Sequence, residues 1–336
     1  MKAPAVISTL AGLAVAIALV MVSDPVAIGH AILGTGWGIL AVIALHFPQM
    51  ICSGQAWRSA VPSPAVPAPA VFFGLRWIRE GVNALLPVAQ IGGEFVGARL
   101  MALKGVPLST AGASVTVDLT LEMLSQVIFT LLGLGLLFGH LQDMQIVRWV
   151  LTGSFAAAGV LAVFVFSQRF GMFALLERGL LRLAERQNWK GLKDIAGLHR
   201  DIVTLYKSPR RLIQGISFHF LSWLLGGAEV MAAFHVVGAP VGLRDSLIVE
   251  SLGQAFHALG FAVPGALGVQ EGGLVLVCAW LGIDQQIAIE LSLLKRVREV
   301  VLGIPGLFAW RWIEGRRLVA DTTPPPQDNI SPEEAA

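Results

Sequence analysis

The chain has 336 residues, of which 55% are hydrophobic and 14% are charged. Soluble domains carry about 25% charged residues, so this composition excludes an ordinary water-soluble domain and indicates a protein whose apolar surface is covered by a bilayer. The net charge of +2 is close to zero, and nucleic acid is therefore not expected as a partner.

A helix needs about 20 apolar residues to cross the hydrocarbon core, and we expect about six of the apolar runs to do so in full. No small-x-small cleavage site precedes Asp24, so we expect the first run to be an uncleaved helix. The pattern predicts an all-α, polytopic membrane helix bundle with about six full spans. The runs lie at 3–22, 30–50, 109–138, 146–167, 211–237 and 286–312.

Basic residues between the runs predict the orientation, because Lys and Arg are retained on the cytoplasmic side. The stretch 168–210 is rich in them and has apolar residues at helical spacing, which predicts a cytoplasmic amphipathic connector. Both termini are expected in the cytoplasm, with the protein in the inner membrane. We expect a single transmembrane domain over 1–320 and a disordered tail over 321–336.

Two segments do not fit a simple up-and-down course. The chain is expected inside near Arg58 and inside again near Lys104, yet the second half of segment 66–103 is too short to span. Segment 243–283 is likewise expected to begin and end on the same side of the membrane, in this case the outside. We therefore predict two re-entrant hairpins broken by proline and glycine. The expected break and turn positions are Pro87, Gly92, Gly93, Pro264, Gly265, Gly268 and Gly272.

The two hairpins resemble each other. A shift of 177 residues without a gap places Pro87 on Pro264, Glu94 on Glu271, Asp118 on Lys295 and Glu122 on Glu299. Three full crossings lie between the copies, so the second copy (243–312) would be inverted relative to the first (66–138), as in many transporters. The alternative is a pair of unrelated proline kinks.

Charged residues in the apolar segments predict a polar path through the membrane. An unpaired charge at the bilayer centre costs about 2.5–3.5 kcal/mol, so such groups must face water or one another. We expect Asp118 to pair with Lys295, and Glu122 with Arg296 or Arg298. The alternative is that the ion pairs only lock the bundle. The residues proposed for the path are Arg79, Asn83, Glu94, Arg99, Asp118, Glu122, His257, Glu271, Lys295, Arg296 and Glu299.

Glu94 and Glu271 follow the predicted turns, where each half-helix begins. Helix N-termini favour anions, so the two tips are expected to frame a central polar site. The alternative is that each glutamate caps the amides of its own half-helix.

The sequence predicts neither catalysis nor a cofactor. It contains no HExxH, GxSxG, phosphate-binding loop or zinc spacing, and Cys52 and Cys278 predict no disulfide or metal site. His219 and His235 are interpreted as core or pore residues.

Three motifs carry a family resemblance: REGVNALLPVAQIGGEFVGARL (79–100), GASVTVDLTLEMLSQ (112–126) and FAVPGALGVQEGGL (261–274). They resemble the signatures of the lysylphosphatidylglycerol synthase transmembrane-region family of flippase-like proteins, over about 10–315. Within it, the first motif is most similar to the hopanoid-biosynthesis-associated membrane proteins. The chain departs from the family pattern in the spacing of Glu94 and Arg99 and in having Leu119 after Asp118.

This resemblance implies a lipid transporter or flippase that moves or provisions a hopanoid or a related amphiphile. The soluble aminoacyl-transferase domain of the full synthases is not found here, so their aminoacylation activity is not expected. Two alternatives stay open: a membrane-embedded lipid-modifying enzyme, and a scaffold for partners in lipid biosynthesis.

Overall fold

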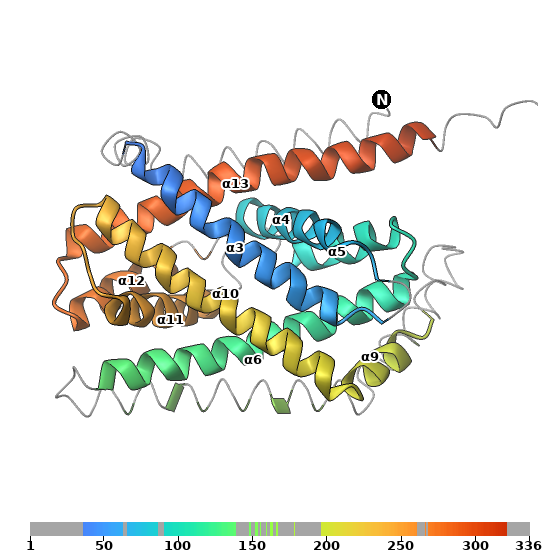
Figure 1. Cartoon of the computed structure of the whole chain (residues 1–336), viewed down its shortest axis with the longest axis horizontal. Coiled ribbons are helices and arrows are strands. Elements are labelled where there is room, and N and C mark those ends of the chain that lie inside the picture. The colour runs from blue at the N-terminus through green and yellow to red at the C-terminus, as the bar shows by residue number, and fades with distance from the viewer. Residues whose placement is uncertain are drawn as a thin grey trace, which may run out of the picture.

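The computed structural model describes residues 36–62, 66–86, 91–138, 196–260, 266 and 268–320, with isolated positions between 148 and 178. All regular structure in these ranges is helical, as predicted (Figure 1). Several predictions lie outside the described residues. They concern the span at 3–22, most of the span at 146–167 and of the connector, the tail at 321–336, and the turn residues Pro87, Pro264 and Gly265.

Three of the predicted spans are confirmed as helices long and apolar enough to cross a membrane. They are α3 (Gly38–Ser59), α6 (Leu108–Phe138) and α10 (Pro209–Val236). The fourth long helix, α13 (Gln285–Ala320), covers the predicted run at 286–312 and is more highly charged. The protein is therefore a multi-pass membrane protein.

Each segment predicted as a hairpin is a pair of short helices that pack against each other. α4 (Pro69–Leu85) packs on α5 (Gly92–Ala102), and α11 (Leu243–Leu259) packs on α12 (Val269–Trp280). With 11 and 12 residues, α5 and α12 are shorter than the roughly 20 residues that cross a bilayer. Their re-entrant placement in the membrane stays a prediction.

Glycines permit the breaks in different ways. Gly268 precedes α12 with φ at +80°, a conformation that favours glycine. Gly92 begins α5, and a Cβ on Gly93 would lie 2.4 Å from the carbonyl oxygen of Arg79, so this glycine allows α5 to approach α4. Gly272 lies within α12 with open space around it, and its position shows no turn.

The centre of the fold is the antiparallel pair of α3 and α10, which lie side by side in Figure 1 with α13 and α6 toward opposite edges. α4 packs on α13, and α11 packs on α6. Two glycine contacts between α3 and α10 repeat under the 177-residue shift: Gly38 lies against Val236, and Gly215 lies against Ser59. The contacts of one half of the fold (α3 to α6) thus have counterparts in the other half (α10 to α13).

The remaining described helix, α9 (Leu198–Tyr206), belongs to the end of the predicted connector and packs on α6. It buries Ile202, Leu205 and Tyr206 there, and its Asp201 accepts hydrogen bonds from the hydroxyl groups of Ser109 and Thr110 on α6. Large apolar side chains such as Phe95, Ile213 and Phe308 are exposed on the outer helix faces, where lipid would cover them.

Candidate functional site

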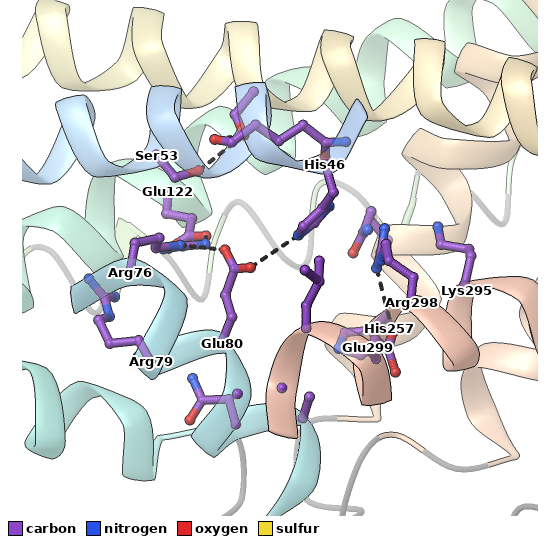
Figure 2. A pocket seen from close by; sticks show the side chains of 18 of the residues that line it. His46, Ser53, Arg76, Arg79, Glu80, Glu122, His257, Lys295, Arg298 and Glu299 are labelled. Atoms are coloured by element: carbon purple, nitrogen blue, oxygen red, sulfur yellow. Dashed lines mark hydrogen bonds and ion pairs between the residues drawn. The ribbon is translucent and has the colours of Figure 1, made fainter. Parts of the chain in front are cut away.

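A cavity of about 310 Å³ lies between the two halves, and described residues from α3, α4, α5, α6, α10, α11, α12 and α13 line it (Figure 2). Its wall contains five carboxylates, five permanent cations and two histidines. Ionisable groups within membrane-spanning helices are costly unless they serve a function or pair with one another, so this cavity is the candidate functional site. The group comprises Glu80, Glu94, Glu122, Glu250, Glu299, Arg76, Arg79, Lys295, Arg296, Arg298, His46 and His257.

Arg79 is the centre of the charge network in the first half. Its guanidinium donates to Asp118 at 2.8 Å and forms an ion pair with Glu94. It also lies over the ring of Trp57, 4.6 Å from the ring centroid. Asp118 has a second partner, the Nε2 atom of His219 at 2.9 Å. The network is almost fully buried, so its charges depend on one another rather than on water.

A second guanidinium, Arg76, joins α4 to α6. Its two Nη atoms lie 2.9 and 2.5 Å from the carboxylate oxygens of Glu122, the fork geometry that suits arginine and a carboxylate. Its Nε donates to Glu80 at 2.8 Å, one helical turn further along α4. Glu80 faces the cavity and is more exposed than its neighbours.

The second half holds three cations of α13, each with its own acid. Lys295 donates to Glu250 of α11 at 2.6 Å, and Arg298 donates to Glu229 of α10. Arg296 donates to Glu271 at 2.9 and 3.0 Å and to Glu299 at 2.9 Å. These contacts tie α13 to α10, α11 and α12.

The predicted pairs between the two halves are wrong. Asp118 pairs with Arg79 rather than with Lys295, and Glu122 pairs with Arg76 rather than with Arg296 or Arg298. The reason is that helices of the same half bring the counter-charges closer: α4 supplies both partners of α6, and α10, α11 and α12 supply the partners of α13. The stripes face the cavity separately and are neutralised locally.

The glutamates that follow the two turns differ in role. Glu271 accepts a hydrogen bond from the Gly268 amide at 2.6 Å, so it caps its own helix as the alternative interpretation expected. Glu94 makes no such bond with any of the described residues of its helix. The amide of Gly93 donates instead to Asn83 Oδ1 at 2.7 Å, and Asn83 Nδ2 lies 3.3 Å from Glu94.

Most of the predicted path residues line the cavity, and three do not. His257 lies in the wall and contacts Gln270 at 2.7 Å. Asp118 is buried behind Arg79, and Glu271 lies beside the wall on Arg296. Arg99 is exposed and pairs with Glu314 at 2.7 Å, so its place in a path is not supported by this geometry.

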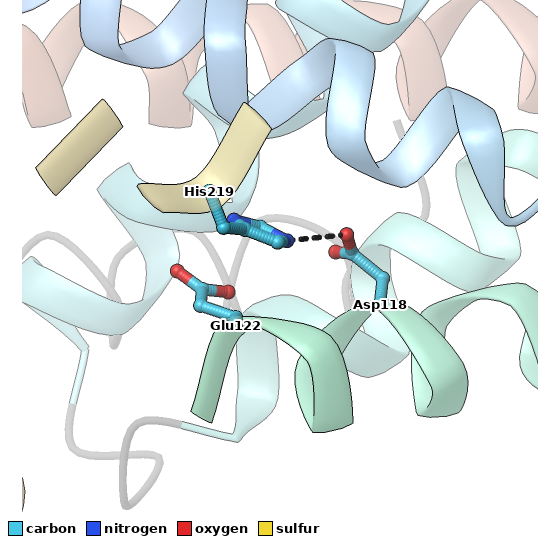
Figure 3. Close-up of side chains that lie close together, drawn as sticks. All are labelled: Asp118, Glu122 and His219. Atoms are coloured by element: carbon cyan, nitrogen blue, oxygen red, sulfur yellow. Dashed lines mark hydrogen bonds and ion pairs between the residues drawn. The ribbon is translucent and has the colours of Figure 1, made fainter. Parts of the chain in front are cut away.

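Asp118, Glu122 and His219 place three potential metal-ligand atoms within 4.8 Å of one another (Figure 3). Both carboxylates are already neutralised, by Arg79 and Arg76 respectively. A cation at this point would have to compete with two guanidinium groups. The cluster therefore functions as part of the ion-pair network.

Sequence reasoning missed His46, Gln49 and Glu229. Glu229 is an acid inside the apolar run 211–237, and the rule for intramembrane charges should have selected it. His46 gave a weaker signal, because a histidine near the end of an apolar run is common at membrane interfaces. In the structure its ring lies between Glu80 and Glu229.

The chain matches one described protein family. A family model described as the lysylphosphatidylglycerol synthase TM region matches residues 9–306. No curated protein and no solved structure matches the chain.

Proposed function

The chain belongs to the lysylphosphatidylglycerol synthase TM region family, and from this membership we propose that it moves a lipid across the membrane by holding the polar head group in the central cavity. The cavity wall supports this proposal, because it offers both charged donors and charged acceptors at the level of the membrane helices. The lipid tail would remain among the exposed apolar side chains of the outer faces.

The cavity wall has equal numbers of permanent cations and carboxylates, and this narrows the chemical class of head group that it could bind. Five carboxylates face five permanent cations, so neither a bare anion nor a bare cation is favoured. A polyol or a zwitterion matches such a surface, since hydroxyl groups both donate and accept hydrogen bonds. The Nε atoms of Arg79 and Arg298, both wall residues, have no acceptor among the described residues, which leaves two donors for a ligand. The resemblance to hopanoid-associated proteins points to a polyol-headed hopanoid.

The proposal includes no catalytic step. The acids and bases of the cavity are engaged in ion pairs with one another, whereas a general acid or base would need to face the reacting group. It also includes two re-entrant hairpins related by an inverted repeat, cytoplasmic termini and alternating exposure of the cavity to the two sides. The matched contacts of α3 and α10 support this arrangement.

A reconstitution experiment tests the transport proposal. The full chain is placed in phosphatidylethanolamine and phosphatidylglycerol vesicles with a fluorescent polyol-headed hopanoid, and movement is followed by chemical quenching of the outer leaflet. We expect Glu94→Gln combined with Glu271→Gln to slow movement about tenfold or more, because each loses a charge-assisted hydrogen bond.

Glu290→Gln is the matched control, because it makes the same chemical change on α13 outside the cavity wall. It should leave the rate unchanged. Movement no faster than in protein-free vesicles would reject the proposal for this lipid class. A changed lipid mass after incubation would favour the enzyme alternative.

A further inference from the structure

His46 on α3 contacts a carboxylate at each of its two ring nitrogens. Nδ1 lies 3.0 Å from Glu229 on α10, and Nε2 lies 3.1 Å from Glu80 on α4. Figure 2 shows the ring extending from α3 toward Glu80. The imidazole is thus a bridge between an acid of the first half and an acid of the second.

Two hydrogen bonds from the ring to ionised carboxylates need two N–H groups, and a neutral imidazole has only one. A neutral imidazole has one N–H and one lone pair, and an ionised carboxylate only accepts. With two ionised partners, one ring nitrogen would direct its lone pair at a carboxylate oxygen about 3 Å away. An imidazolium donates to both partners and removes this repulsion.

The surrounding charges favour the same form. Groups on four packed elements bear on His46: Glu80 and Arg76 from α4, Glu229 from α10, Arg298 from α13, and Glu122 from α6 through Arg76. The contacts run in the order Arg298, Glu229, His46, Glu80, Arg76, Glu122. If His46 is an imidazolium, positive and negative charges alternate along this row. With all three carboxylates ionised, they face two guanidiniums, and the imidazolium supplies the third positive charge that makes the row neutral.

The two carboxylates are unequal partners. Glu229 is also bound by Arg298 and Gln49, and its side chain is 2% exposed. Glu80 is also bound by Arg76, and its side chain is 31% exposed on the cavity. When the ring has a single proton it can donate to only one acid. Glu80 is the acid that can turn to water or to a ligand.

We propose that His46 is a proton-binding site that couples proton movement to occupancy of the cavity. In its protonated form the ring donates a hydrogen bond to Glu80 and another to Glu229, and so it links the charged groups of the two halves. When the proton leaves to cavity water, the ring keeps its bond to Glu229, and Glu80 accepts hydrogen bonds from the hydroxyl or ammonium groups of a head group. The coupling rests on the proposed transport function, whereas the proton site itself does not.

Histidine protonation can be read directly, without any lipid movement. The full chain, labelled with ¹⁵N-histidine, is studied in detergent by ¹⁵N NMR between about pH 5 and 9, the range in which histidines titrate. We expect both nitrogens of His46 to show the N–H form at neutral pH. Glu80→Gln should restore a single tautomer there, because the new amide can donate to the ring lone pair.

Two control variants fix the assignment. His46→Gln should remove the resonance, whereas His235→Gln should leave it, since His235 is exposed and contacts only the Met231 carbonyl among the described residues. If His46→Gln does not fold, the difference between Glu80→Gln and Glu290→Gln identifies the signal. A single-tautomer His46 throughout the pH range would overturn the proton site.

Transport measured at two pH values tests the coupling separately. In the vesicles described above, the wild-type rate should change between about pH 5.5 and 8.5, and the Glu80→Gln rate should not. A doubly protonated His46 with a pH-independent wild-type rate overturns the coupling alone. No movement at either pH rejects the transport function and leaves the NMR result as the test of the proton site.

Discussion

Arg79 and Asp118 lie 2.8 Å apart with their side chains 1% and 0% exposed, and this pair fixes α4 against α6 at the base of the cavity. Neither charge can be solvated by water. The pair therefore makes the first half rigid around the cavity, and it holds Asp118 where His219 also reaches it.

Removing one member of this pair should destabilise the folded protein. Asp118→Asn leaves Arg79 with Glu94 alone and takes the anion from His219. We expect it to lower the free energy of unfolding by about 3–5 kcal/mol, the usual cost of breaking a buried ion pair. Thermal unfolding in detergent measures the change. Asp284→Asn, at the exposed start of α13, retains capping ability and should change little. Equal effects at both positions would contradict the role given to the pair.

Gly93 should not tolerate a side chain. In Gly93→Ala the new methyl would lie 2.4 Å from the Arg79 carbonyl oxygen and 2.8 Å from Asn83, so α5 must move away from α4. We expect a loss of about 1–3 kcal/mol, typical of overpacking, seen as a lower melting temperature. Gly272→Ala is the control, because nothing lies within 4 Å of the added methyl and the residue is helical. It should be neutral or stabilising, and a destabilised Gly272→Ala would restore a turn role for this residue.

The pairing within each half can be measured by double-mutant cycles. Glu250→Gln and Lys295→Met remove two groups that are 2.6 Å apart, so their effects on stability should couple by about 0.5–3 kcal/mol. Asp118→Asn and Lys295→Met should be additive within about 0.5 kcal/mol, because each has its partner elsewhere. Strong coupling of Asp118 to Lys295 would restore the predicted pair between the halves.

Chemical labelling tests whether α4 and α5 form a re-entrant hairpin. Single cysteines replace Arg58 and Lys104 in a chain whose Cys52 and Cys278 are changed to alanine. An impermeant thiol reagent applied to sealed vesicles should reach both new cysteines from the same side. The reason is that α5, with 11 residues, cannot complete a crossing. Labelling from opposite sides would remove the hairpin and the inverted repeat that depends on it.

The sequence was sufficient to predict the long helices but not their charge pairing. The run 109–138 corresponds to α6 within one residue, because hydrophobic length and the end of an apolar run are local properties. The partners of Asp118 and Glu122 are Arg79 and Arg76 of α4, about 40 residues earlier in the chain. Other cations were equally eligible by sequence, and only the three-dimensional arrangement of the helices selects among them.

The residues missed by sequence reasoning share a cause. Glu229 and His46 lie in long apolar helices, and the partners that join them to the charge network are more than 30 positions away in the sequence. By contrast, the cap at Glu271, which sequence reasoning gave as the alternative, involves Gly268 three residues earlier, and local reasoning could reach it.

The 177-residue shift relates α3 to α10, and one contact between these two antiparallel helices is related to itself. The shift of 177 residues carries Gln49 onto position 226, and Gly226 is the residue that Gln49 itself lies against. A substitution at either end of this helix pair alters the surroundings of one half. A substitution at Gln49 or Gly226 alters both halves together, because each of these residues belongs to one half and contacts the other.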